Sequence, residues 1–181
     1  MRDAWAGKPV SLDGNEDVAI EVHPRPRQRP EPPIWVAAFG PKALAQAGRL
    51  GLPYLCSPME SLATLEDNYG HHRMAAEGAG VEMPTIVPLM RTVFVSTDEN
   101  RLLKVRAELA QHSENARMKD GESHEDWTIV GTPEQVLEKL DTYQTRLGMT
   151  HMVATRLRIG GIPEEALRES VALLAKILSD D

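Results

Sequence analysis

A glycine–proline pair between a short apolar run and a helix start is the strongest candidate for a ligand site. The segment consists of Ala38, Phe39, Gly40, Pro41 and Lys42. At a helix start, unpaired backbone amides and the helix dipole attract anions. Gly40 lets the backbone approach a phosphate closely, and Pro41 costs nothing where an amide would be idle. The alternative is a plain turn in which the Gly-Pro pair only caps the helix.

Two arginines just beyond the last predicted strand form a second candidate. Arg156 and Arg158 are two positions apart, so alternation places them on the same side if the strand extends that far. In βα barrels the active site lies at the C-terminal ends of the strands, and phosphate sites often use the last loops. One arginine could therefore reach an anionic substrate. The alternative is a surface ion pair with Glu164 or Glu165.

Strands and helices alternate along the chain from Ile34 onward, and they must position these residues. Apolar runs predict strands at 34–38, 52–56, 87–95 and 149–154. Helical patterns follow at 41–50, 58–77, 98–111, 133–147 and from Pro163. Ser57 and Thr97 are predicted N-caps, Thr132 opens a capping box with Gln135, and Gly148 ends that helix. Residues 112–127 are polar and aperiodic, which is typical of an exposed excursion.

The strands predict a parallel α/β fold. They are apolar throughout, as in parallel strands that are buried on both faces, and their alternation with helices indicates right-handed βαβ units. Four such units could form half of an eight-stranded barrel or a small open sheet. Residues 1–33 contain a proline cluster and no clear period, so we expect an extended segment with a short strand at 18–22. The predicted division is therefore 1–33 and 34–181.

A series of short motifs in a fixed order resembles the bacterial luciferase-like monooxygenase family. They are GKPV at 7–10, PPIWV at 32–36, GPKAL at 40–44, AGRLG at 47–51, IVGTPEQV at 129–136 and LGMTHMV at 147–153, with Arg156 after them. The resemblance covers nearly the whole chain. It implies a TIM-type (βα) barrel to which this chain would supply strands five to eight. Because a full barrel needs about 250 residues, the first half would be absent, and with it the positions of the usual catalytic side chains.

The resemblance also implies a cofactor and a partner. In similar proteins the loop corresponding to 38–42 holds the phosphate of FMN or of the deazaflavin F420, and Arg156 or Arg158 would reach the flavin or an anionic substrate. We expect FMN, because GLPYL at 51–55 looks more like the FMN-using branch. A second copy or a complementary N-terminal half-barrel chain would have to complete the barrel.

Composition excludes several other classes of protein. The formal net charge is −7 and no segment gathers basic residues on one face, which argues against nucleic acid or an anionic membrane as a partner. No apolar run reaches the roughly 18 residues that a membrane span needs. The single cysteine, Cys56, suits a cytoplasmic protein, and no cluster has the spacing of a metal site.

The expected function is a flavin-dependent oxidoreductase or monooxygenase that acts on a small organic substrate in a barrel completed by another chain. One alternative is a non-catalytic flavin-binding or remnant protein of the same fold. Another is that the sequence is a truncation of a longer reading frame.

Overall fold

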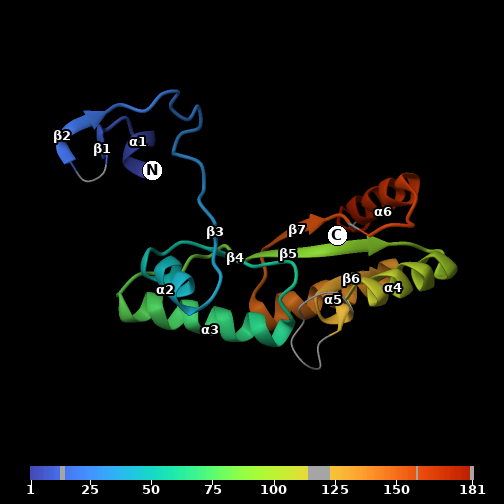
Figure 1. The fold of residues 1–181 in the computed structure, drawn as a ribbon. Helices are drawn as coiled ribbons and strands as arrows, with labels where there is room; N and C mark the ends of the chain where they lie inside the picture. The colour runs from blue at the N-terminus through green and yellow to red at the C-terminus, as the bar shows by residue number, and fades with distance from the viewer. Residues whose placement is uncertain (13–14, 114–122, 158, 180–181) are drawn as a thin grey trace. The chain divides into compact units, whose positions relative to one another are not determined.

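The computed structural model describes residues 1–12, 15–113, 123–157 and 159–179 of the chain (Figure 1). Contacts between residues divide the chain into two compact units, Met1–Ile34 and Trp35–Asp181. Every candidate site residue belongs to the second unit.

The first unit contains a short helix and a hairpin. Helix α1 spans Arg2–Trp5, and strands β1 (Val10–Leu12) and β2 (Asn15–Ile20) pair in antiparallel fashion. Strand β2 overlaps the strand expected at 18–22, whereas β1 was not predicted. Its three residues are too few for a strand period to develop.

The second unit is built on parallel strands. Strand β3 (Val36–Ala37) pairs with β4 (Tyr54–Leu55), and β5 (Pro88–Val95) lies between β6 (Thr128–Gly131) and β7 (His151–Thr155). All of these pairs are parallel, as the sequence predicted. Strand β6 was not predicted, because its four residues merge with the polar stretch before it and the capping box after it. The strands form a two-stranded and a three-stranded sheet, so the half-barrel of four units stays a prediction.

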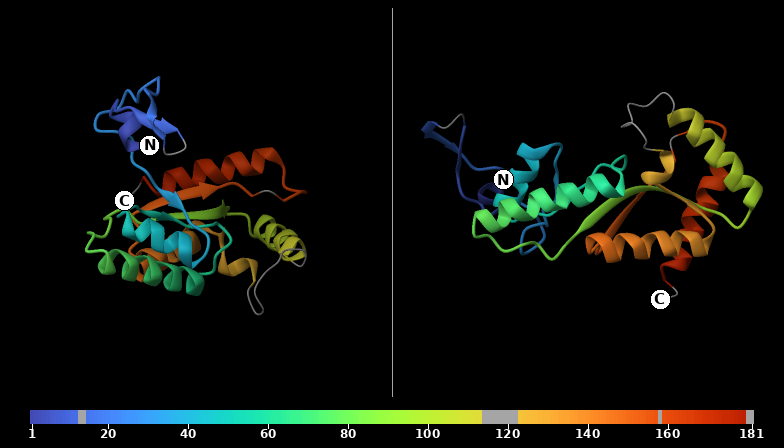
Figure 2. Two further views of the ribbon diagram at one scale, coloured as in Figure 1. Left: turned by 60° about the vertical axis from the view of Figure 1, so that its left-hand side comes forward. Right: turned by 90° about the horizontal axis from the view of Figure 1, so that it is seen from below.

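The helices alternate with these strands. They are α2 (Pro41–Arg49), α3 (Leu62–Gly78), α4 (Glu99–Ser113), α5 (Pro133–Leu147) and α6 (Glu164–Ile177), with a 3₁₀ turn, η1, at His124–Asp126. Helix α2 packs on α3, and α5 contacts β6, α3 and α6. Figures 1 and 2 show α2, α3 and α5 on one side of strands β3, β4 and β5. No helix in the described part of the chain is both long and apolar enough to span a membrane.

The ends of the helices test the predicted caps. Thr132 and Gln135 form the expected capping box at α5, and Gly148 ends that helix in the left-handed region with φ 71°. Two N-caps were wrong: α3 begins at Leu62 with Ser61 as its cap, and the carboxylate of Asp98, not Thr97, accepts from the amide of Arg101 at α4. At α3 the helix starts late because the Glu60 carboxylate binds the Ser57 amide (2.6 Å) and closes a turn there.

Two apolar clusters stabilise this unit. The larger lies between β3, β4, β5 and helices α2, α3 and α5, and includes Leu44, Tyr54, Leu65, Leu89 and Tyr143. The smaller joins Phe94, Leu102, Val105, Trp127 and Ala166. Strand alternation gives the sheets two faces. Tyr54 and Leu89, on the helix side, are 1% and 0% exposed, whereas Leu55 and Met90, on the other side, are only partly buried.

Candidate functional site

The loop that follows β3 presents a glycine and an aromatic ring to solvent. Ala38 is buried against the larger cluster and anchors the loop, while the side chain of Phe39 is 72% exposed. Gly40 has φ 80° and ψ 169°, a backbone conformation that residues other than glycine rarely adopt. A Cβ added there would meet nothing within 4 Å, so the space above Gly40 is open.

Helix α2 begins in this open space without a side-chain cap. Gly40 is its N-cap and Pro41 its first residue, so the first backbone amides that lack an intrahelical acceptor belong to Lys42 and Ala43. By contrast, Ser61 caps α3 and Thr132 caps α5. Lys42 is exposed and the first turn contains no acidic residue. The uncapped amides, the helix dipole and the Lys42 ammonium group together favour an anion at this helix start.

The neighbouring loop, residues 57–60, lies at the same edge, because β4 is parallel to β3 and both carboxyl ends point the same way. Its shape is fixed by Glu60, whose carboxylate accepts hydrogen bonds from the Ser57 amide (2.6 Å), the Tyr54 hydroxyl (2.8 Å) and the Asn68 amide group (2.9 Å). Burial, and then the hydrogen bond to Glu60, raise the pKa of Tyr54. The phenol therefore stays protonated and donates to Glu60.

A fully buried arginine fixes the conformation of this loop through hydrogen bonds to its backbone. The Arg91 guanidinium donates to the carbonyl oxygens of Glu60 (2.7 Å), Met90 (2.9 Å) and Ser57 (3.3 Å), and its Nε donates to the Tyr143 hydroxyl (3.1 Å). The cation also lies 5.0 Å from the centre of the Tyr143 ring. No ion pair within the described residues includes Arg91, so neutral oxygens and a ring stabilise its charge.

Sequence reasoning missed Arg91 and its contacts with Ser57, Glu60 and Tyr143. The signal was present: a single cation at the centre of the apolar run PLMRTVFV. A charge in a strand that is buried on both faces must be satisfied by specific partners. The identity of those partners depends on the turn at residues 57–60, which the predicted helix start at Ser57 had obscured.

The candidate residues do not all meet in one cavity. Arg156 is exposed directly after β7 and lines a small cavity with Phe94, Thr155, Leu157 and Ser170. None of residues 38–42 lines that cavity. Glu164, one of the expected surface partners, pairs with Arg168 (2.7 Å). Arg158 lies outside the described residues. Within the part of the chain that the structure describes, no group of His, Cys, Asp and Glu residues could hold a metal ion.

Solved structures with the same fold include a monooxygenase, an enzyme in complex with FMN and an F420-dependent enzyme. Monooxygenase RslO1 from Streptomyces bottropensis superposes with a TM-score of 0.73 at 19% identity, over 99% of this chain and 57% of its own. The oxygenating constituent of 3,6-diketocamphane monooxygenase from Pseudomonas putida, solved in complex with FMN, gives 0.68 at 16% identity, over 97% of this chain and 59% of its own. An F420-dependent secondary alcohol dehydrogenase gives 0.63 at 16% identity, over 86% and 52%.

These likenesses show the fold, which is of the TIM-barrel type, and the chain spans less than two thirds of the length of these structures. No curated protein matches the sequence. The family profile described as luciferase-like monooxygenase, however, matches residues 1–151, most of the chain. The chain therefore belongs to the luciferase-like monooxygenase family.

Proposed function

We propose that this chain forms the phosphate-binding part of a flavin-dependent oxidoreductase or monooxygenase. The observation that carries the proposal is the start of α2, where Gly40 has φ 80°, open space above it and no side-chain cap. A flavin phosphate fits this arrangement, because it needs close approach to the backbone and unpaired amides. The amides of Lys42 and Ala43 and the Lys42 ammonium group would hold the phosphate, and the exposed ring of Phe39 would lie beside the cofactor.

The chemistry itself would come from the flavin, which in its reduced form would react with oxygen beside a small organic substrate. The chain's own part is to bind and orient the cofactor. Ala38 anchors the phosphate loop in the core, while Glu60 and Arg91 fix the adjacent loop at residues 57–60. Arg156, at the end of β7, would supply a positive charge to the flavin or to an anionic substrate.

We propose FMN as the flavin, with F420 as the alternative. The structural relatives include one solved with FMN and one that uses F420, so their fold favours neither. The segment GLPYL at 51–55, which resembles the FMN-using branch, supports FMN. The visible absorption spectrum of the purified protein separates the two, since flavin and deazaflavin absorb at different wavelengths.

The non-catalytic alternative, a flavin-binding protein without oxygen chemistry, shares the same loop and differs in whether the barrel is completed. Leu55, Met90 and Val153 lie on the face of the strands away from the helices and stay partly exposed. An active enzyme would cover this face with further polypeptide, in the form of a complementary half-barrel or a second copy. A flavoprotein that binds FMN yet consumes no oxygen when its flavin is reduced would favour the alternative.

FMN titration tests the Gly40 loop in two variants of Gly40, with binding measured as quenching of the flavin fluorescence. Gly40→Asp and Gly40→Asn impose similar backbone strain, but only aspartate places a negative charge at the helix start. We expect Gly40→Asp to abolish FMN binding and Gly40→Asn to weaken it less. Arg156→Ala should weaken binding at least tenfold if it meets a charged group, corresponding to about 1.5 kcal/mol.

Gly80 provides the matched control. It also has a positive φ (64°) and open space around it, but it follows the end of α3 instead of preceding a helix. Gly80→Asp should leave FMN binding unchanged. If folded Gly40→Asp binds FMN as tightly as the Gly80→Asp protein does, the phosphate assignment is wrong.

A further inference from the structure

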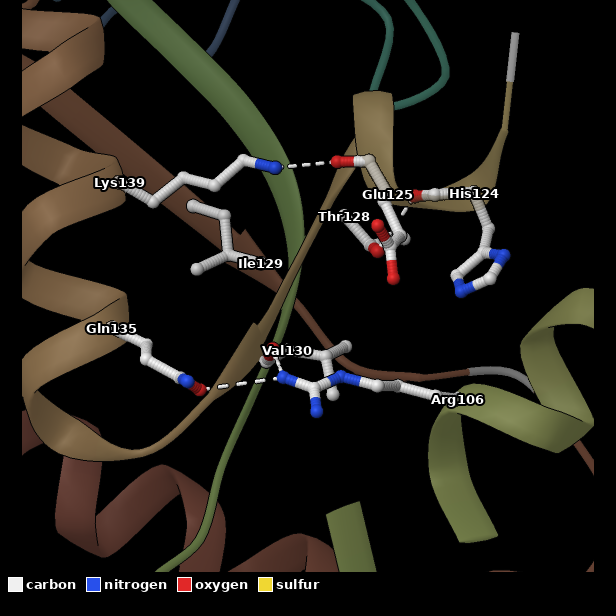
Figure 3. Close-up of a pocket in the computed structure, with 8 residues that line it drawn as sticks. All are labelled: Arg106, His124, Glu125, Thr128, Ile129, Val130, Gln135 and Lys139. Carbon is white, nitrogen blue, oxygen red and sulfur yellow. Dashed lines mark hydrogen bonds between the residues drawn. The ribbon is translucent and has the colours of Figure 1, made fainter. Parts of the chain in front are cut away.

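A cavity of about 190 Å³ lies between α4, the η1–β6 segment and α5 (Figure 3). Its lining includes the basic side chains of Arg106, His124 and Lys139 together with the carboxylate of Glu125. Figure 3 shows Arg106 entering from α4 and Lys139 from α5, with the ends of His124 and Glu125 directed into the same space. None of residues 38–42 lines this cavity, so it is separate from the proposed flavin loop.

The Arg106 guanidinium lines the cavity, and no hydrogen bond or ion pair joins it to a carboxylate among the described residues. Its Nη2 donates to the carbonyl oxygen of Val130 (3.0 Å) and to Oε1 of Gln135 (3.3 Å). Gln135 is itself held, because the same oxygen accepts from the Thr132 amide in the capping box of α5. A guanidinium has five N–H donors, and these two contacts involve only one of its nitrogens.

Lys139 is also held by a neutral acceptor. Its ammonium group donates to the backbone carbonyl of Glu125 and has two further N–H donors. Burial lowers the pKa of Lys139, against the opposing effect of the Asp126 and Glu125 carboxylates. Nε2 of His124 is shielded from solvent and has no hydrogen-bond partner among the described residues. Three nitrogen groups from three segments therefore share one cavity, and no hydrogen bond or ion pair among the described residues joins them to a carboxylate.

We propose that this cavity binds a small oxyanion such as phosphate. The lining carries two cations, Arg106 and Lys139, and one carboxylate, Glu125, while the Asp126 carboxylate also acts on Lys139. An oxyanion offers several acceptor oxygens within a compact volume, and hydrogen bonds between charged groups are the strongest that side chains make. The Glu125 carboxylate repels the anion, so it limits the affinity.

Isothermal titration with inorganic phosphate at low salt tests the site, using the whole 181-residue chain with Gly40→Asp so that the flavin loop cannot contribute. We expect saturable binding that Arg106→Gln and Lys139→Gln each weaken about tenfold or more, the loss of one charge-assisted hydrogen bond. Glu125→Gln should strengthen binding, because it removes the repelling charge while keeping the shape of the side chain. Glucose 6-phosphate, titrated in parallel, shows whether a phosphate ester or only the free ion is accepted.

Lys104 is the matched control, since it is an exposed cation on α4, the helix that carries Arg106. Lys104→Gln should leave phosphate affinity unchanged. Because Arg106 and Lys139 come from different helices, misfolding of one variant leaves the other to decide. The proposal is overturned if the parent protein shows no saturable phosphate binding, or if the folded variants at Arg106 or Lys139 bind phosphate as tightly as Lys104→Gln. Neither outcome depends on flavin binding.

Discussion

Arg91 is among the largest side chains that are completely buried in the described part of the chain. Burying an unpaired cation is costly, and here the cost is offset by hydrogen bonds to the oxygens of Ser57, Glu60 and Tyr143. Two of those oxygens are backbone carbonyls of the loop at residues 57–60. Arg91 therefore stabilises a loop conformation at the carboxyl end of β4, next to the loop proposed to bind flavin.

Replacing Arg91 should destabilise the protein strongly. In Arg91→Met the side chain still fills space, but the Glu60 carbonyl and the Tyr143 hydroxyl lose their donor, whereas the Ser57 carbonyl keeps the Glu60 amide (3.4 Å). Each buried group left unsatisfied costs about 1–3 kcal/mol, so we expect the free energy of unfolding to fall by at least about 2 kcal/mol. Urea denaturation measures this value, provided that the slope of the transition is unchanged.

Arg146→Met is the control for this variant. Arg146 pairs with Glu66 at the surface, and its side chain is 52% exposed. Exposed pairs contribute about 0–1 kcal/mol, so its replacement should change stability little. Equal effects of the two substitutions would show that the buried network at Arg91 contributes no more than a surface ion pair.

At the scale of elements, the sequence predicted those strands and helix ends that follow from the spacing of apolar residues and from capping residues. Strand β5 and the capping box at Thr132 were placed to within a residue. Strand β6 was missed because Thr128–Gly131 owes its extended form to pairing with β5, a contact distant in sequence. The start of α3 was misplaced because Glu60 bonds to the Ser57 amide, and propensity alone cannot show where a carboxylate side chain will bind.

The candidate sites also divide into those marked by local sequence signals and those formed by contacts distant in sequence. The helix start at Gly40 could be found from the sequence, because both its glycine and its proline are local signals. The cavity lined by Arg106, His124 and Lys139 could not, since its residues come from segments that only the packing of α4 and α5 around β6 brings together. Arg91 lay between these cases: its burial was predictable, but its partners were not.

The contact between α2 and α3 depends on one glycine and gives a prediction at the scale of elements. A Cβ on Gly48 would lie 2.3 Å from the carbonyl oxygen of His72, so the two helices can approach this closely only without a side chain there. Gly48→Ala must push the backbones apart and should lower the free energy of unfolding by about 1–3 kcal/mol, as overpacking of a core does.

Gly70 is the control, because it lies within α3 and an added Cβ would meet nothing within 4 Å. Gly70→Ala should stabilise the protein by about 0.5–1 kcal/mol, since alanine is the better helix former. Thermal and urea denaturation should show changes of opposite sign in the stability of the two variants. A neutral or stabilising Gly48→Ala would mean that α2 and α3 are not packed this closely.

At the scale of the whole molecule, the strands bury their two faces unequally. The helix side carries Tyr54, Leu89 and Arg91, all nearly or fully buried. On the other side Leu55, Met90 and Val153 keep part of their surface exposed and Ala37 is exposed, whereas Phe94, farther along the same face of β5, is buried. In a closed barrel both faces of every strand are covered, and no strand has a free edge. The second face is therefore where we expect further polypeptide to pack.

We predict that this chain, purified alone, associates through that face. Each 100 Å² of apolar surface left in water forgoes about 2.5 kcal/mol, and a whole domain is stable by only about 5–15 kcal/mol. Two copies, or a separate chain that supplies the complementary half, would cover the surface and pair the free strand edges. Sedimentation velocity at micromolar concentration should show a dimer or larger species, and Met90→Asp, which places a charge on the face, should shift the distribution toward monomer.

Asp67→Ala, on the exposed surface of α3, serves as the control and should leave the distribution unchanged. A monomer that melts cooperatively and binds no hydrophobic dye would contradict the prediction, because it would show that the exposed face needs no partner.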